Sequence, residues 1–163
     1  MTKPDENTNY HAMLIKLQNW CAYQERSPKD CLLKSRELGA TKDEANSLLS
    51  DLISNNFVNE ERFAQLFTQG KFRIKKWGKL KIKLELKKKN ISNYSINKAI
   101  SLIDEGDYIK TIEQLISKKV NGNILSEKPQ DKFKLIRYLN SKGFDMEIIN
   151  DVLNKKQYIL YFK

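Results

Sequence analysis

The chain has 163 residues, of which 30 are basic and 20 acidic, and its formal net charge is +10. Hydrophobic residues make up 40% and charged residues 31%, which favours a globular protein and excludes a disordered chain. No apolar run approaches the ~20 residues of a membrane-spanning helix, and the first residues lack the apolar segment of a secretory signal. We therefore expect a cytoplasmic protein without membrane contact.

The first predicted repeat covers residues 10–58 and follows a flexible tail at 1–9. Apolar residues at helical spacing predict a helix over 10–24. Ser27 followed by proline predicts the start of a second helix, because serine caps helices and proline fits their first turn. Gly39 is typical of the left-handed cap that ends a helix, and a third helix follows it.

The second predicted repeat covers residues 59–106 and includes a segment with two readings. Residues 79–86 alternate between polar and apolar, which is the period of a strand, and Trp77-Gly78 before them would form the turn of a hairpin. The register of the repeats requires a helix at the same place. We predict the helix, with apolar groups on two of its sides.

The third predicted repeat covers residues 107–163, with a helix over 108–118 and a C-terminal extension. Turns at Gly39, Asn90 and Gly143 align the three repeats at spacings of 51 and 53 residues. Apolar columns flank these turns in register, which is a strong sign of repetition. The prediction is an all-α fold of three tandem three-helix repeats forming an elongated, curved array. The aligned columns are Cys31, Ile82 and Leu135; Ser35, Leu86 and Leu139; Ala45, Ile96 and Ile149; and Leu49, Ile100 and Leu153.

The positive charge is concentrated between residues 71 and 89, a stretch with ten basic side chains and a single acidic one, Glu85. A solvated helix face usually carries interleaved acidic partners, so this stretch favours a polyanionic partner or an acidic protein groove. About half of these ten cations are expected to make contact. The candidates are Lys71, Arg73, Lys75, Lys76, Lys79, Lys81, Lys83, Lys87, Lys88 and Lys89. A secondary basic group, for which a mixed helix face is an equal alternative, is Lys128, Lys132, Lys134, Arg137 and Lys142.

Several stretches resemble the RecX family of regulatory proteins. Residues 56–64 (NFVNEERFA) resemble the family's turn-Asp-x-x-Phe-Ala element, with Glu60 in place of the usual aspartate. Residues 77–82 (WGKLKI) and 86–91 (LKKKNI) resemble its Gly-x-x-x-Ile and Leu-x-x-Lys-Gly-Ile patterns, with Asn90 in place of glycine. Further landmarks lie at 24–27 and 138–144, so that the likeness extends over about 10–153.

The resemblance implies a regulatory protein without enzymatic activity that binds the RecA recombinase filament on single-stranded DNA. It also implies that the protein mainly inhibits the ATPase and strand-exchange activity of the recombinase in DNA repair and recombination. The basic middle of the chain is compatible with a groove lined by protein and DNA phosphates. The alternatives are a sequence-neutral nucleic-acid-binding repeat protein with no recombinase partner, and a helical adaptor for an acidic protein. We expect a monomer.

For the other candidate residues, a structural role is favoured over a functional one. Trp77 among cations is compatible with stacking on a base, but core packing is favoured. Phe63 and Phe67 are expected in the core. His11 is the only histidine, and Cys21 and Cys31 are ten residues apart, so neither a catalytic triad, a disulfide scaffold nor a metal site is indicated. Adjacent carboxylates and the lack of a phosphate-binding loop likewise give no catalytic residues and no cofactor. Tyr158, Tyr161 and Phe162 are expected to cover the last repeat.

Overall fold

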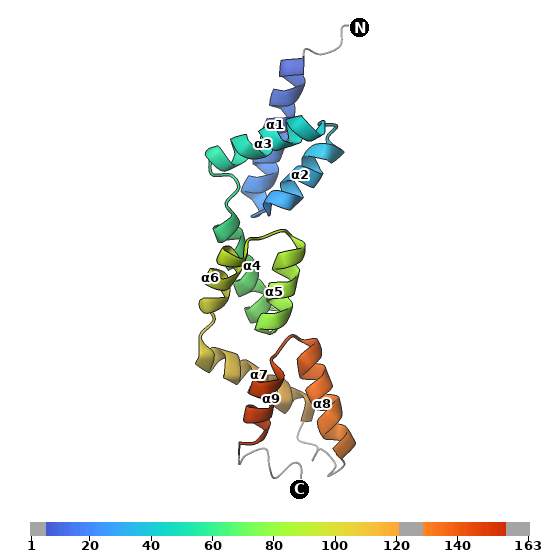
Figure 1. The fold of residues 1–163 in the computed structure, drawn as a ribbon, viewed down its shortest axis with the longest axis vertical. Helices are drawn as coiled ribbons and strands as arrows, with labels where there is room; N and C mark the ends of the chain where they lie inside the picture. Colours follow the sequence, from blue (N-terminus) through green and yellow to red (C-terminus); the bar gives the residue numbers. More distant parts are fainter. Residues whose placement is uncertain (1–5, 121–128, 156–163) are drawn as a thin grey trace. The chain divides into compact units, whose positions relative to one another are not determined.

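The computed structural model describes residues 6–120 and 129–155, and every regular element within these ranges is an α-helix (Figure 1). The predicted all-α fold is therefore confirmed. None of the helices in the described ranges is long and apolar enough to cross a membrane. The helices are α1 (Glu6–Tyr23), α2 (Pro28–Glu37), α3 (Lys42–Ser54), α4 (Glu60–Arg73), α5 (Lys79–Lys88), α6 (Asn93–Ser101), α7 (Glu105–Val120), α8 (Pro129–Ser141) and α9 (Met146–Leu153).

The ends of the helices follow the capping signals of the sequence. Ser27 precedes α2, and its hydroxyl accepts a hydrogen bond from the Asp30 amide at 3.1 Å, while Pro28 occupies the first helical position. Thr41 caps α3 in the same way, and the Glu44 carboxylate accepts a bond from the Thr41 amide at 2.7 Å. Such reciprocal capping boxes satisfy amides that the first turn of a helix leaves without partners.

The three aligned turns have the same backbone structure. Gly39, Asn90 and Gly143 have φ angles of 99°, 59° and 90°, all in the left-handed region. Asparagine tolerates this region better than most residues with a side chain, which explains its place in the second turn. In each turn the following residue donates a backbone hydrogen bond to the carbonyl five residues earlier, which is the Schellman cap. These bonds join Ala40 to Ser35, Ile91 to Leu86 and Phe144 to Leu139, at 3.1 to 3.3 Å.

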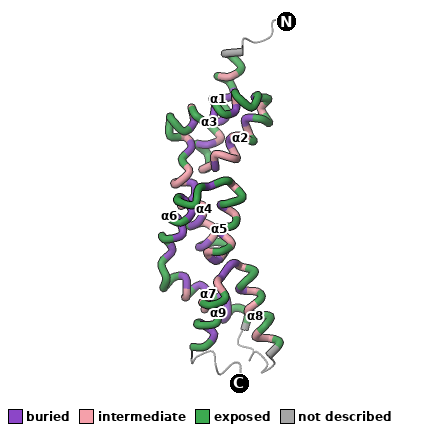
Figure 2. The backbone as a smooth tube through the Cα atoms, viewed as in Figure 1, coloured by how far each residue is buried: buried purple, intermediate pink, exposed green. Residues whose placement is uncertain are grey.

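The aligned apolar columns form the buried faces of the helices (Figure 2). All members are buried except Leu49, which is half-buried. The residue that follows each turn glycine or asparagine is buried as well, because the left-handed turn directs the chain back onto its own repeat. The three-helix repeats predicted from the turns are thereby confirmed as structural elements.

Helix α5 shows how the alternating segment folds. Ile82 and Leu86 are four residues apart, share one face of the helix and are fully buried. Leu80 and Leu84 lie on a different face and are 46% and 54% exposed. The helix prediction is confirmed, but only one of the two apolar sides is packed. The strand-like alternation therefore reflects one core face and a second apolar face that remains accessible.

Two compact units make up the chain. Unit 1 comprises Met1–Phe67 with Leu86–Lys98, and unit 2 comprises Thr68–Glu85 with Ala99–Lys163. The division passes through α4 and α5. The repeat boundaries between residues 58 and 59 and between residues 106 and 107 remain predictions from the sequence.

Each unit has its own core. In unit 1, Leu17, Leu48 and Leu52 are fully buried where α1, α2 and α3 pack together. The thiols of Cys21 and Cys31 meet in this core, with their Sγ atoms 3.7 Å apart. In unit 2, the Tyr108 ring lies between Phe72 and Phe144, with ring centroids 6.0 and 5.1 Å away. Helices α7, α8 and α9 pack against one another in this unit.

Candidate partner-binding surface

A hydrogen-bonded cluster around Arg62 fixes the start of α4 in unit 1. The Asn59 side chain accepts a hydrogen bond from the Arg62 amide at 2.9 Å and thus caps the helix. The Arg62 guanidinium donates to the Asn56 side chain at 2.9 Å and forms an ion pair with Glu25. Two of the stretches that resemble the RecX family, 24–27 and 56–64, therefore contact each other through one ion pair.

The Glu60 side chain reaches the start of α6. Its carboxylate accepts hydrogen bonds from the Ser92 amide, at 3.1 Å, and from the Ser92 hydroxyl. Burial alone would raise the pKa of Glu60, but the hydrogen bonds from Ser92 and Ser95 hold this pKa below its ordinary value. The glutamate at this position thus ties α4 to the first turn of α6.

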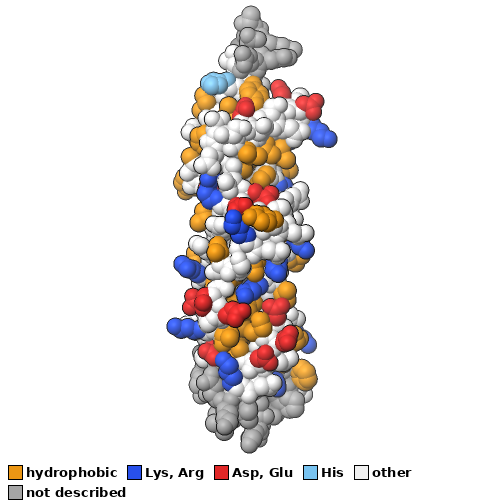
Figure 3. Space-filling model, turned by 60° about the vertical axis from the view of Figure 1, so that its left-hand side comes forward, with side chains coloured by type: hydrophobic (Ala, Val, Ile, Leu, Met, Phe, Trp, Pro, Cys, Tyr) orange, Lys and Arg blue, Asp and Glu red, His pale blue; other side chains and the backbone are white. Residues whose placement is uncertain are grey.

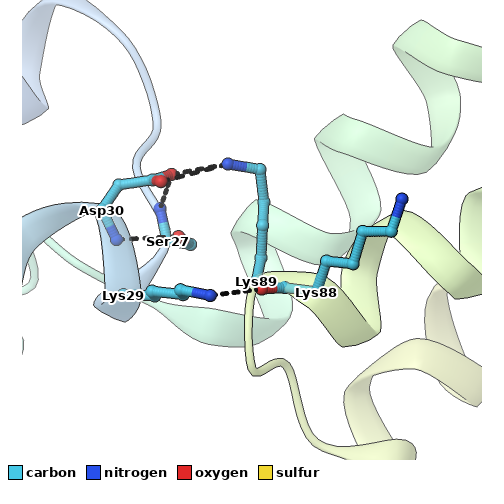
Figure 4. A network of polar contacts seen from close by, with 5 residues as sticks. All are labelled: Ser27, Lys29, Asp30, Lys88 and Lys89. Carbon is cyan, nitrogen blue, oxygen red and sulfur yellow. Dashed lines mark hydrogen bonds and ion pairs between the residues drawn. The ribbon is translucent and has the colours of Figure 1, made fainter.

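The start of α2 contacts the turn between α5 and α6, a contact that we call the first junction (Figure 4). The Lys89 ammonium forms an ion pair with Asp30 at 3.0 Å, and the Lys29 ammonium donates to the Lys88 carbonyl at 2.7 Å. Burial would raise the pKa of Asp30, but hydrogen bonds from Ser27 and Lys89 and the Lys89 charge hold this pKa below its ordinary value. The first junction is therefore held together by an ion pair and a hydrogen bond that charged side chains make.

The start of α5 contacts the turn between α8 and α9 in unit 2, which we call the second junction. Here the Gly78 amide donates to the Lys142 carbonyl at 2.8 Å, and the Leu80 amide donates to the Gly143 carbonyl at 3.0 Å. A Cβ atom on Gly78 would lie 2.2 Å from the Gly143 carbonyl, and one on Gly143 would lie 2.3 Å from the Lys81 Cβ. Both glycines are required because the two backbones touch.

Tyr108 connects the second junction to the core of unit 2. Its phenol oxygen accepts a hydrogen bond from the Lys79 amide at 3.1 Å, and its hydroxyl donates to Asp145 at 3.5 Å. Burial, together with the nearby Asp145 carboxylate, raises the pKa of Tyr108 to about 12. The sequence pattern placed Tyr108 only in a helix, since neither of these partners lies near it in the chain.

Two rings of unit 2 each have two lysine ammonium groups close by. The ammonium groups of Lys71 and Lys81 lie 4.9 and 4.6 Å from the Trp77 ring centroid. Those of Lys119 and Lys142 lie 4.5 and 5.7 Å from the Tyr138 ring centroid. Cation–π attraction of this kind keeps positive charge beside a half-buried ring. The alternative reading of Trp77, stacking on a base, stays a prediction.

The ten candidate cations divide between the units and differ in exposure. Lys71, Arg73, Lys75, Lys76, Lys79, Lys81 and Lys83 belong to unit 2, whereas Lys87, Lys88 and Lys89 belong to unit 1. Lys89 is engaged at the first junction, and the Lys79 ammonium lies 4.7 Å from the centroid of the buried Tyr108 ring. The exposed members are Arg73, Lys75, Lys87 and Lys88.

The accessible face of α5 combines apolar and basic side chains. Leu80, Leu84, Lys87 and Lys88 are all exposed and follow the i, i+4, i+7, i+8 spacing of a single helical stripe. Lys83 is half-buried at the edge of this stripe. We call these five residues the α5 stripe. A surface of this kind suits a protein partner that offers both apolar contacts and negative charge.

The secondary basic group is dispersed. Lys134 pairs with Asp131 at 3.4 Å, Arg137 is exposed and Lys132 is half-buried. Lys142 is the exception, because it lines a cavity of about 570 Å³ in unit 2. Lys128 lies outside the described residues. The complete lining of the cavity is Ile74, Lys75, Lys76, Leu115, Lys118, Lys119, Tyr138 and Lys142.

The remaining residues singled out in the sequence have ordinary surroundings where they are described. Phe63 is buried and Phe67 half-buried, with their ring centroids 5.7 Å apart, whereas His11 is exposed. On the face drawn in Figure 3, basic, acidic and apolar side chains are interspersed. Within the described ranges, no cluster of three or more histidine, cysteine or acidic side chains is arranged to hold a metal. Tyr158, Tyr161 and Phe162 lie outside the described residues.

Comparison with known proteins identifies relatives over most of the chain. The model of the RecX second three-helix domain matches residues 59–100, and that of the RecX third three-helix domain matches 106–153. A regulatory protein RecX of Clostridium perfringens is 31% identical over 134 residues, covering 80% of this chain and 61% of the relative. One from Lactobacillus johnsonii is 26% identical over 138 residues, covering 85% of this chain and 51% of the relative. The chain therefore spans about half to three fifths of the length of these curated relatives.

Solved structures share the fold. The crystal structure of RecX from Lactobacillus salivarius matches with a TM-score of 0.81 at 22% identity, covering 93% of this chain and 97% of that one. A second crystal structure of a regulatory protein RecX matches with a TM-score of 0.79 at 17% identity, covering 92% and 79%. The succession of three-helix repeats is thus shared with proteins whose sequences differ at most positions.

Proposed function

Because the chain belongs to the RecX family of regulatory proteins, we propose that it binds a RecA-type recombinase filament on single-stranded DNA and lowers its ATPase and strand-exchange activity. The observation that carries this proposal is the α5 stripe, in which Leu80 and Leu84 are 46% and 54% exposed beside lysines. A surface that binds only nucleic acid does not require exposed leucines. A filament, by contrast, offers apolar protein contacts and DNA phosphates side by side.

The proposal predicts that small amounts of this protein slow DNA-dependent ATP hydrolysis by a RecA-type recombinase. The double variant Lys83→Glu/Lys87→Glu should lose this inhibition, since it reverses two charges on the α5 stripe. Lys79 and Lys81 are left intact because both contact aromatic rings of unit 2. A control with Lys16→Glu and Lys42→Glu makes the same charge change at exposed sites on α1 and α3. No inhibition by the unmodified protein at an equimolar ratio would contradict the proposal.

The leucines separate this function from its alternative, a nucleic-acid-binding repeat protein with no recombinase partner. Leu84→Ser removes apolar surface from the α5 stripe and leaves every cation in place. It should weaken inhibition of the recombinase while affinity for naked single-stranded DNA remains unchanged. If Leu84→Ser inhibits as well as the unmodified protein, and the Lys83→Glu/Lys87→Glu variant loses both activities in parallel, the alternative is favoured.

A further inference from the structure

The lysine-lined cavity of unit 2 lies outside the α5 stripe. It is formed where the end of α4, the end of α7 and the end of α8 converge, and its volume of about 570 Å³ is within the usual range of ligand sites. Five of its lining residues are lysines, and its described lining includes no carboxylate. Lys118 and Lys119 belong to the last turn of α7, and Lys142 follows α8.

Five lysines line this one cavity, and an anion bound there would offset their positive charge. Like charges that share a concave, partly apolar surface repel one another more strongly than charges spread over an open face. The contacts that hold two of them are weak: Lys119 and Lys142 lie beside the Tyr138 ring, and Lys142 donates to the Lys75 carbonyl at 3.5 Å. A bound phosphate would accept stronger, charge-assisted hydrogen bonds from the same groups.

The other walls of the cavity indicate what the phosphate is attached to. Ile74 and Leu115 are apolar, and Tyr138 presents a half-buried ring. Together with the lysines they match the two parts of a nucleotide, an anionic phosphate and a flat base. Outside the cavity lining, Trp77 follows Lys76 in the chain, and the Lys81 ammonium lies beside the Trp77 ring and donates to the Ser141 carbonyl. A second ring beside a second pair of lysines suits the next nucleotide of a strand better than a free mononucleotide.

We propose that this cavity binds one nucleotide unit of single-stranded nucleic acid, with its phosphate on Lys118, Lys119 and Lys142 and its base against Tyr138. The inference deepens the proposed function and rests on it, because it assigns the DNA contact to the cavity and leaves the protein contact to the α5 stripe. Lys118 and Lys119 lie outside the basic stretch of residues 71–89, so composition alone did not single them out.

The test measures the affinity of the full chain for a short labelled oligodeoxythymidine over a series of salt concentrations. Lys118→Ala/Lys119→Ala should weaken binding about tenfold, and the slope of log affinity against log salt should fall by ~0.7 for each phosphate that the variant no longer neutralises. Lys110→Ala/Lys155→Ala is the matched control, since it removes the same charge from exposed lysines of unit 2 outside the cavity. It should change the affinity by less than about twofold. Lys118→Arg/Lys119→Arg should retain both the affinity and the slope.

Three results would overturn the proposal. The first is an equal drop in affinity in the cavity and control variants, which would mean that net charge alone matters. The second is unchanged binding by Lys118→Ala/Lys119→Ala in protein that still unfolds cooperatively. The third is displacement of the strand by micromolar ATP or pyrophosphate, which would assign the cavity to a free nucleotide. Inhibition of the recombinase is measured on the same samples. If the unmodified protein inhibits and the cavity variant binds DNA normally, this inference fails while the proposed function stands.

Discussion

The first and second junctions place equivalent parts of the repeats in contact but use different chemical groups. In both, the start of a middle helix meets the left-handed turn that ends the next middle helix along the chain. Asp30 and Lys89 join the first junction through an ion pair, whereas Gly78 and Gly143 join the second through touching backbones. The same repeat geometry is therefore compatible with a contact that tolerates many side chains and with one that tolerates almost none.

The largest difference is expected from Gly143→Ala. Its Cβ would lie 2.3 Å from the Lys81 Cβ, and its φ of +90° disfavours any side chain. We expect the free energy of unfolding to fall by about 3 kcal/mol. Gly39→Ala is the control, because its φ is +99° and, its chain neighbours aside, no atom of the described residues lies within 4 Å of the added group. It should cost only about 1 kcal/mol. Equal decreases in denaturant titrations would mean that the close backbone contact contributes nothing beyond the strain of the turn.

A smaller effect is expected from Lys89→Met at the first junction. The methionine keeps a side chain of similar length and removes the ammonium, which pairs with Asp30 and lies 5.8 Å from the Phe63 ring centroid. Both partners are less than one third exposed, so we expect the free energy of unfolding to fall by about 1 kcal/mol at low salt. This decrease should shrink as salt is added, because ions screen the pair. The cost of Gly143→Ala should not depend on salt, and a similar salt response in the two variants would remove the distinction between the junctions.

The smallest expected effect is a change in the free energy of unfolding at low pH. The pKa of folded Asp30 lies below its ordinary value of 3.8, so its contribution to stability is present above that pH and is lost as the pH falls through the lowered pKa. The difference between the unmodified protein and Lys89→Met should therefore be constant near neutral pH and shrink below about pH 4. Thermal melts over this range measure it. A difference that persists in strong acid would show that the ion pair is not its source.

The local part of the fold was predictable from the sequence. Ser27, Gly39 and Asn90 carry capping and turn chemistry within a few residues, and the apolar columns follow from the register of the turns. The polar–apolar alternation of residues 79–86 is typical of a strand, but the register of the repeats requires a helix there, and helix α5 was therefore predicted correctly. Which of its two apolar faces would be buried was not predictable, since that depends on the neighbouring helices.

The site was less predictable, because its contacts join residues far apart in the chain. Arg62 and Glu25 are 37 positions apart, as are Tyr108 and Asp145. The lysines of the cavity lie at the end of one helix, α7, and just after the ends of two others, α4 and α8. A count of charges identified the basic stretch of residues 71–89, but it could not distinguish Lys89, which is held by Asp30, from exposed Lys87.

The α2–α3 turn has the same left-handed cap as the other two turns, yet among the described residues only its chain neighbours lie within 4 Å of the position where Gly39 would carry a Cβ. In the other two turns, residues at or next to the equivalent position contact the start of another middle helix. The same pairing of a helix start with a left-handed turn thus links successive modules, although the groups in contact differ between the two junctions. Gene duplication could lengthen such a protein by whole modules without redesigning the existing ones, and an engineer could graft an extra module onto this turn by the same rule.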